Sequence, residues 1–136
     1  MATSEVTYLG NLRTSNKHLT SGSVILTDAP TDNQGEGLHF SPTDLLSTSL
    51  AACMITIMGI TARNKNIELG EVEASVTKEM TSNPRRVTTI QIHLKFPDKK
   101  YTPQEQDTLK LAAIHCPVAK SLHPDIIQDL KFEFTL

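Results

Sequence analysis

The two cysteines are the residues of this chain best suited to take part in a chemical reaction. Cys53 and Cys116 are its only cysteines, and the N-terminal stretch MATSEVTYLG lacks the basic and apolar regions of a secretory signal. In a reducing compartment a structural disulfide is a poor default. The pair forms no CxxC motif and has no further thiols to complete a zinc site. We therefore expect free or redox-active thiols in the cytoplasm, and no metal.

Cys53 lies in an apolar stretch, where burial would keep a thiol protonated and inert. The simplest interpretation is a small core side chain. An ordinary thiol is only about 3% ionised at pH 7, and bringing its pKa to about 6 takes about 3.4 kcal/mol of stabilisation. A close arginine could supply much of this, and Arg13 is the candidate because a guanidinium can contact a thiolate or a carboxylate in bidentate fashion. The alternative for Arg13 is a solvated charge at a strand end.

Cys116 is followed by Pro117, which would end one helix and suits the first turn of another. We expect Cys116 at or near the N-cap of a short helix, where amides favour its thiolate and make it a competent partner in thiol–disulfide exchange. His115 is better interpreted as a capping or surface residue than as a catalytic base. The remaining histidines show no metal-ligand spacing.

Two longer helices are predicted to position these cysteines. The first begins at SPTD (residues 41–44), which has a serine cap, a proline at the first helical position and an acidic residue in the first turn. Residues 45–65 are apolar or small on nearly every face, so this helix should be enclosed, although it is too polar for a membrane span. The second helix, about 102–115, begins with the capping box TPQE.

Segments with the residue pattern of β-strands occur before, between and after the predicted helices in the sequence. Residues 4–28 predict a β-hairpin or meander with a turn in TSNKHLTSGS (14–23), and residues 28–37 predict an exposed loop. Apolar and polar residues alternate at 71–77 and 90–96, which predicts an antiparallel hairpin with one solvent-exposed face, and residues 130–136 predict a last strand. These elements indicate one α+β domain over residues 1–136. The 136 residues carry a formal net charge of -2, which gives no reason to expect a nucleic-acid or membrane partner.

Two segments together resemble a known family. SPTDLLSTSLAAC (41–53) is similar to the proline-headed helix of the OsmC/Ohr proteins, which ends on their peroxide-reactive cysteine. HCPVAKSL (115–122) is similar to their second-cysteine motif. With an arginine-bearing strand and the segment ILTDAP before them, the resemblance extends over nearly the whole chain, within the OsmC-like branch.

The resemblance implies an OsmC-like fold in which antiparallel curved sheets surround a long buried central helix, in an intertwined homodimer with active sites at the subunit interface. In that family the first cysteine attacks an organic hydroperoxide, becomes a sulfenic acid and condenses with the second. A dithiol reductant, notably a lipoylated one, then reduces the disulfide. By position, Cys53 and Cys116 match these cysteines and Arg13 matches the activating arginine. No metal or organic cofactor is implied.

The chain departs from the family pattern at Thr43, where the peroxidase branches have a glutamate that holds the arginine over the cysteine. Arg13 therefore lacks an obvious carboxylate partner, and Asp44 or Glu36 would have to substitute. We expect Thr43 and Asp44 on the substrate side of the site, and we expect Thr43→Glu to speed catalysis.

The predicted function is a thiol peroxidase acting on organic hydroperoxides, with hydrogen peroxide as a second substrate. The main alternative is an OsmC-like dimer that binds a small hydrophobic ligand or senses redox state without significant peroxidase activity. A metabolic enzyme of another class is the third alternative.

Overall fold

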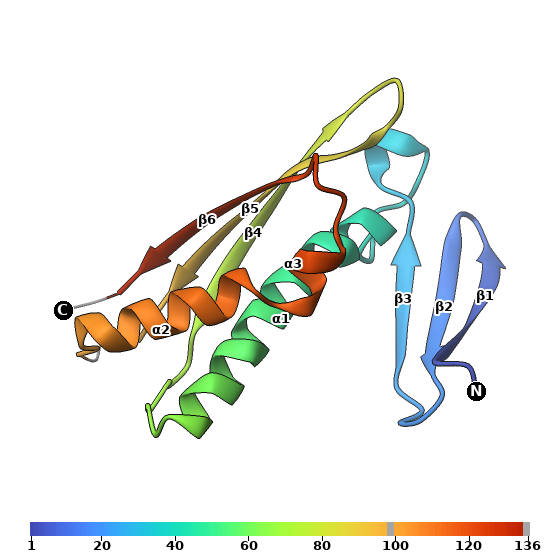
Figure 1. Cartoon of the computed structure of the whole chain (residues 1–136). Coiled ribbons are helices and arrows are strands. Elements are labelled where there is room, and N and C mark those ends of the chain that lie inside the picture. The colour runs from blue at the N-terminus through green and yellow to red at the C-terminus, as the bar shows by residue number, and fades with distance from the viewer. Residues whose placement is uncertain (98–99, 135–136) are drawn as a thin grey trace. The chain divides into compact units, whose positions relative to one another are not determined.

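The computed structural model describes residues 1–97 and 100–134. In chain order its elements are β1 (Ser4–Gly10), β2 (Arg13–His18), β3 (Val24–Asp28), the 3-10 helix η1 (Thr31–Asn33), α1 (Pro42–Asn64), β4 (Glu73–Thr81), β5 (Arg86–Lys95), α2 (Pro103–Ile114), α3 (Pro117–Ser121) and β6 (Ile127–Glu133). The fold is α+β, as predicted (Figure 1). The chain forms two compact units, Met1–Leu46 and Ser47–Leu136, each described by itself below. The prediction of a single domain stays a prediction.

The first unit is an antiparallel meander in the order β1-β2-β3. Asn11 and Leu12 form the tight turn between β1 and β2, and both have positive φ (57° and 61°). The meander is confirmed, but the turn predicted over residues 14–23 is wrong in its first half. Residues 14–18 belong to β2, which is paired on both sides. Ladder hydrogen bonds to two neighbours outweigh the turn preference of these small polar residues.

The second unit contains a sheet in the order β4-β5-β6. β4 and β5 pair antiparallel, as predicted, whereas β6 runs parallel to β5. The expectation of purely antiparallel sheets is therefore wrong at this edge. A parallel neighbour needs a long crossover, and α2 and α3 occur in the connection from β5 to β6. The last strand is observed at Ile127–Glu133, and residues 135–136 of the predicted strand lie outside the described residues.

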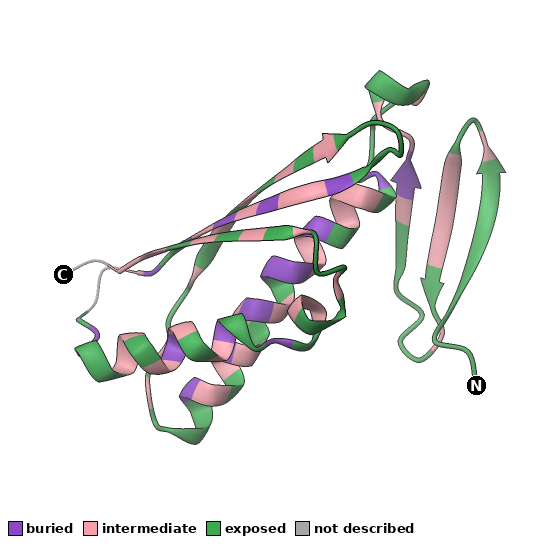
Figure 2. Ribbon diagram, turned by 45° about the horizontal axis from the view of Figure 1, so that its top comes forward, coloured by how far each residue is buried: buried purple, intermediate pink, exposed green. Residues whose placement is uncertain are grey.

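Helix α1 packs one stripe of its surface into the core of the second unit. The buried residues recur three or four positions apart, as a helix period requires: Ser47, Leu50, Ala51, Met54, Met58 and Ala62. Figure 2 shows these buried positions on the helix beside exposed ones. Leu46 and Ile60 are 39% and 50% exposed, so the prediction that every face is enclosed is wrong for a single chain. By length and composition α1 could also cross a membrane, a property that core helices share.

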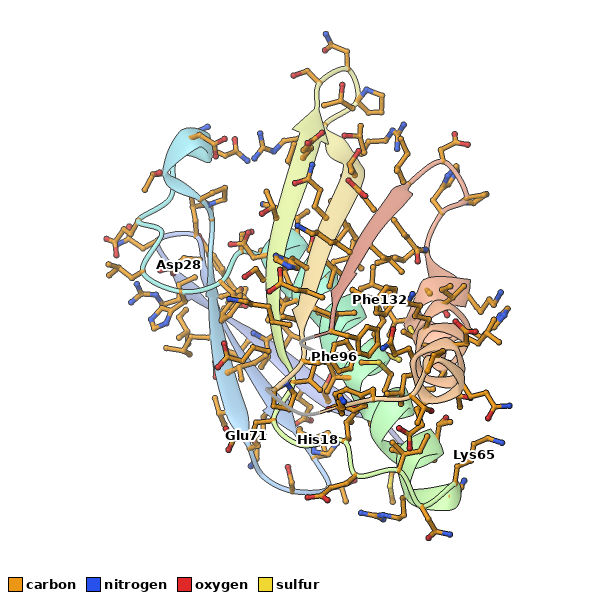
Figure 3. The ribbon with its side chains drawn as sticks, turned by 90° about the vertical axis from the view of Figure 1, so that its left-hand side faces the viewer. His18, Asp28, Lys65, Glu71, Phe96 and Phe132 are labelled. Atoms are coloured by element: carbon orange, nitrogen blue, oxygen red, sulfur yellow. The ribbon has the colours of Figure 1, made fainter. Side chains whose placement is uncertain are left out.

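The sheet contributes the other side of this core. Ile90, Ile92 and Leu94 of β5 are buried, and alternate residues of β5 are only half-buried. In Figure 1, α1 and α2 lie on the same face of the sheet. Of the two phenylalanines labelled in Figure 3, Phe96 belongs to this core and Phe132 is partly buried and packs against it. The sheet therefore has one apolar face, and this face packs against α1, which carries Cys53, and α2, which precedes Cys116.

Helix α2 begins at the predicted capping box. Thr102 Oγ1 accepts the Glu105 N–H at 3.1 Å, and Glu105 Oε1 accepts the Thr102 N–H at 2.9 Å. This reciprocal pair satisfies two amides that the helix itself leaves unpaired. Leu109 and Ala113 of α2 are fully buried. The cap fixes where α2 starts, and the buried residues fix which side of it faces the core.

Candidate active site

The second unit brings Cys53 and Cys116 together. Both are free thiols; Cys53 is half-buried on α1 and Cys116 is fully buried at the start of α3. Cys53 packs against the core cluster to which Cys116 belongs, and its side chain contributes to the electrostatic environment of the Cys116 thiol. Two cysteines far apart in sequence thus contribute to the same core.

Cys116 is the N-cap of α3, as its proline neighbour predicted. Its backbone is extended (φ -68°, ψ 150°), and its Sγ accepts the Ala119 N–H at 3.4 Å. The sulfur therefore occupies the place that a serine or aspartate oxygen takes in most capped helices. The short helix is tied to the sheet as well, because Gln128 Nε2 of β6 donates to Ala119 O at 3.1 Å.

Burial raises the pKa of the Cys116 thiol above its ordinary value. Hydrogen bonds from the amides of Ala119 and Val118 lower this pKa in part, and the contact with Cys53 raises it. The helix amides do favour the Cys116 thiolate, as expected, but desolvation outweighs them and the pKa is raised. Cys116 is a protonated, enclosed thiol, and Cys53 is the more accessible of the two.

Arg13 lies in the first unit, where the pairing of β2 with β3 places it directly opposite Asp28. Its Nε donates to Asp28 Oδ1 at 2.6 Å and its Nη2 donates to Asp28 Oδ2 at 2.9 Å. The hydrogen bond from Arg13 holds the pKa of the Asp28 carboxyl below its ordinary value and raises the pKa of the guanidinium. Arg13 is thus bound in the bidentate geometry that only a guanidinium offers a carboxylate.

Glu36 is a second carboxylate at Arg13. Its Oε2 lies 3.3 Å from Arg13 Nη2, at the end of a loop that folds back on itself. The backbone makes this loop compact: the amides of Asn33 and Gly35 both donate to Pro30 O at 2.9 Å. A Cβ on Gly35 would lie only 1.7 Å from Ala29 O, so only glycine allows the loop to close here.

The expectation that Arg13 lacks an obvious carboxylate is therefore wrong. Glu36 was one of the two candidates and contacts Arg13, whereas Asp28 was missed. Periodicity shows that residues 24–28 form a strand but not which residue of a neighbouring strand stands opposite. The signal that could have found it is an acidic residue at the end of one strand of a meander whose preceding strand begins with arginine, since antiparallel pairing can set these two ends opposite each other.

Thr43 and Asp44 lie in the first turn of α1. Asp44 Oδ2 accepts the Ser41 N–H at 3.0 Å, and Ser41 Oγ accepts the Asp44 N–H at 3.0 Å. Asp44 is therefore engaged in a reciprocal cap, the shorter counterpart of a capping box. Ser41 Oγ also lies 3.3 Å from the Thr43 hydroxyl. Their expected place on the substrate side of the site stays a prediction.

No group of three or more histidine, cysteine or acidic side chains in residues 1–97 and 100–134 could hold a metal ion. His115, directly before Cys116, is exposed and ends α2, where its N–H donates to Leu111 O. This position fits the interpretation of His115 as a capping or surface residue.

A family model described as OsmC-like protein matches residues 35–131. This chain belongs to the OsmC-like family. The matched range contains both cysteines and the first turn of α1 but not Arg13 or Asp28. A search of curated proteins finds no match.

Solved structures of the OsmC-like family show the same fold. A protein from Psychrobacter arcticus 273-4, provisionally described as osmotic stress induced and as part of a detoxification response, is 52% identical, with a TM-score of 0.93 over 97% of this chain and 96% of its own. An OsmC like protein from Mycoplasma pneumoniae has a TM-score of 0.80 at 17% identity, over 98% and 96%. An organic hydroperoxide resistance protein OsmC from Legionella pneumophila has a TM-score of 0.73 at 16% identity, over 100% and 98%. At these lower identities the likeness is one of fold.

Proposed function

We propose that this OsmC-like protein is a thiol-dependent peroxidase that reduces organic hydroperoxides through Cys53 and Cys116. One observation carries the proposal: a half-buried thiol, Cys53, packs against the core cluster that contains a fully buried one, Cys116. The accessible Cys53 suits the attack on a peroxide from solvent, and the enclosed Cys116 suits the step that follows. The name of the Legionella protein, an organic hydroperoxide resistance protein, supports the choice of substrate class.

In the first step the Cys53 thiolate attacks the distal oxygen of the hydroperoxide. The O–O bond breaks, the alkoxide takes a proton and leaves as an alcohol, and Cys53 becomes a sulfenic acid. Cys116 then attacks the sulfenic sulfur: an S–S bond forms, the S–O bond breaks, and hydroxide leaves as water with the proton of the Cys116 thiol. The raised pKa of Cys116 keeps that proton on the sulfur until this step.

A dithiol reductant completes the cycle by two exchange reactions and is itself oxidised to a disulfide. In the proposed function Arg13 stabilises the Cys53 thiolate and orients the peroxide, and the first turn of α1, with Thr43 and Asp44, faces the substrate. No metal or organic cofactor takes part, because thiolate, sulfenic acid and disulfide carry all the electrons.

We propose further that the protein acts as a homodimer in the cytoplasm. Support for the dimer comes from α1, which is apolar around its circumference but buries only one stripe, and from further apolar side chains that are at least half exposed: Val6, Tyr8, Leu38 and Phe40. Light scattering should give twice the subunit mass of 15.0 kDa at micromolar concentration. A stable monomer would contradict the dimer.

A second candidate function is binding of a small hydrophobic ligand, with the thiols acting as a redox sensor. The same exposed apolar side chains favour it, and so does Thr43 in place of the family glutamate. It predicts ligand affinity without turnover. The two candidates therefore differ in whether peroxide is consumed repeatedly.

The test is peroxide consumption by purified protein with a dithiol reductant, using cumene hydroperoxide and hydrogen peroxide in parallel. We expect turnover that Cys53→Ser abolishes, with cumene hydroperoxide the better substrate. Cys116→Ser, treated with cumene hydroperoxide without the reductant, is the matched control: it should first consume about one peroxide per subunit and leave Cys53 as a sulfenic acid, which further peroxide over-oxidises. Unmodified thiols after excess cumene hydroperoxide would contradict the peroxidase and favour the ligand-binding candidate.

A further inference from the structure

The first unit holds one side chain in a way that the family pattern does not explain. Arg13 is clamped through Nε and Nη2 by a carboxylate from the neighbouring strand, although the glutamate that holds this arginine in the peroxidase branches is replaced by Thr43. Asp28 is 1% exposed, so a charged group has been taken out of water at this place. A buried carboxylate is costly unless it is paired and hydrogen-bonded.

We propose that Asp28 is the positioning residue of Arg13 in this protein and replaces the missing glutamate. The inference rests on the proposed function, in which Arg13 stabilises the Cys53 thiolate. Asp28 touches neither thiol nor peroxide in this scheme. It acts only by fixing where the guanidinium points.

Asp28 is itself rigidly held, which a positioning residue requires. Its Oδ2 accepts the Leu38 N–H at 3.0 Å, and its own N–H donates to Phe40 O at 3.1 Å. Figure 3 labels Asp28 where β3 passes into the following loop. The carboxylate is thus fixed by the strand on one side and by the returning loop on the other.

Glu36 is the weaker of the two carboxylates at Arg13. Its side chain is 50% exposed, and its single contact with Arg13, at 3.3 Å, is longer than either bond from Asp28. Exposed ion pairs of this kind contribute little and are screened by salt. Asp28 therefore fixes the orientation of the guanidinium, and Glu36 supplements it.

The clamp leaves part of the guanidinium available for a ligand. Asp28 and Glu36 engage Nε and Nη2, and Nη1 donates to no acceptor in the described residues. The Arg13 side chain is 26% exposed. A guanidinium held along one edge presents its remaining N–H groups in a fixed direction.

The rate at which iodoacetamide alkylates Cys53 tests the inference, measured as a function of pH. All variants carry Cys116→Ser, so that Cys53 is the only thiol, and circular dichroism confirms folding. We expect Asp28→Asn to slow alkylation at pH 7 about tenfold, equivalent to moving the pH profile up by about one unit. Glu5→Gln, which removes one exposed negative charge from β1, is the matched control and should leave the profile unchanged.

The sign of the Asp28→Asn effect separates positioning from simple charge. If Asp28 only neutralised Arg13, removing its charge would make the arginine more effective and speed alkylation, which would overturn the inference. In an Arg13→Gln background, Asp28→Asn should not slow alkylation further, because Asp28 acts through Arg13 alone. If the two substitutions had additive effects, the inference would also be overturned. If Asp28→Asn does not fold, Arg13→Lys takes its place. Lysine keeps the positive charge but cannot form two hydrogen bonds to one carboxylate, so it should also slow alkylation of Cys53. An unchanged alkylation rate would count against positioning.

This readout is independent of turnover. If the wild-type protein consumes no hydroperoxide while Asp28→Asn still slows alkylation, the proposed function fails and the role of Asp28 stands. If the wild type is an active peroxidase and Asp28→Asn leaves alkylation unchanged, the role of Asp28 fails alone.

Discussion

The sulfur cap of α3 can be measured as stability, by replacing Cys116 with alanine and with serine. Alanine removes the acceptor of the Ala119 N–H, and loss of an N-cap costs about 1 kcal/mol. It also removes a fully buried sulfur, which we count as about one methylene group, or about 0.8 kcal/mol. The free energy of unfolding should therefore fall by about 2 kcal/mol in Cys116→Ala.

Serine keeps a capping oxygen at the same place and loses only the burial contribution of the sulfur. Cys116→Ser should therefore be more stable than Cys116→Ala by about 1 kcal/mol, or about 4 °C in melting temperature. Urea unfolding under reducing conditions, at one fixed protein concentration, measures the difference.

Cys53 provides the matched control, since it lies inside α1 and caps nothing. There alanine should be the more stable of the two by about 0.5 kcal/mol, because alanine has the higher helix propensity. The reasoning predicts opposite orders at the two cysteines. Equal stability of the two Cys116 variants, or the order seen at Cys53, would show that the sulfur contributes volume alone and no cap.

Three further predictions concern the first unit. Because folding lowers the pKa of Asp28, its carboxylate stabilises the folded state above about pH 4, and this contribution is lost as pH falls through the folded pKa. In Asp28→Asn the free energy of unfolding should therefore fall less steeply as the solution is acidified. Gly35→Ala should cost more than about 1 kcal/mol in urea unfolding, because its Cβ would collide with Ala29 O, and an unchanged midpoint would mean that the loop can rearrange freely. Thr43→Glu, expected from the sequence to speed catalysis, should leave the Cys53 alkylation rate unchanged if Asp28 already fixes Arg13. A clear acceleration would show that Asp28 does not fully fix the arginine.

What could be read from the sequence is what neighbouring residues decide among themselves. The start of α1 at Ser41, the capping box at Thr102 and the cap at Cys116 each involve hydrogen bonds over three residues, so a short pattern specifies them. The two cysteines were found from longer motifs that are still continuous in sequence, residues 41–53 and 115–122. For these elements sequence and structure agree closely.

What could not be read depends on pairing between distant segments. The opposition of Arg13 and Asp28 follows from strand register, which periodicity leaves open. The net protonation of Cys116 depends on how deeply α3 is buried, which outweighs the local amides. The parallel direction of β6 likewise follows from the course of the chain after β5, since an alternating pattern looks the same in both directions.

That parallel pairing also has a consequence for the order of folding. β4 and β5 are joined by a short turn and pair with neighbours along the chain, whereas β6 reaches β5 only after a crossover that contains α2, α3 and Cys116. Contacts between distant segments form later than local ones because a longer loop must close first. On the ribosome, Cys53 is therefore made and exposed well before its partner can be packed beside it. The nascent chain passes through a stage with one unprotected thiol, and the second cysteine is packed only as the C-terminal strand joins the sheet.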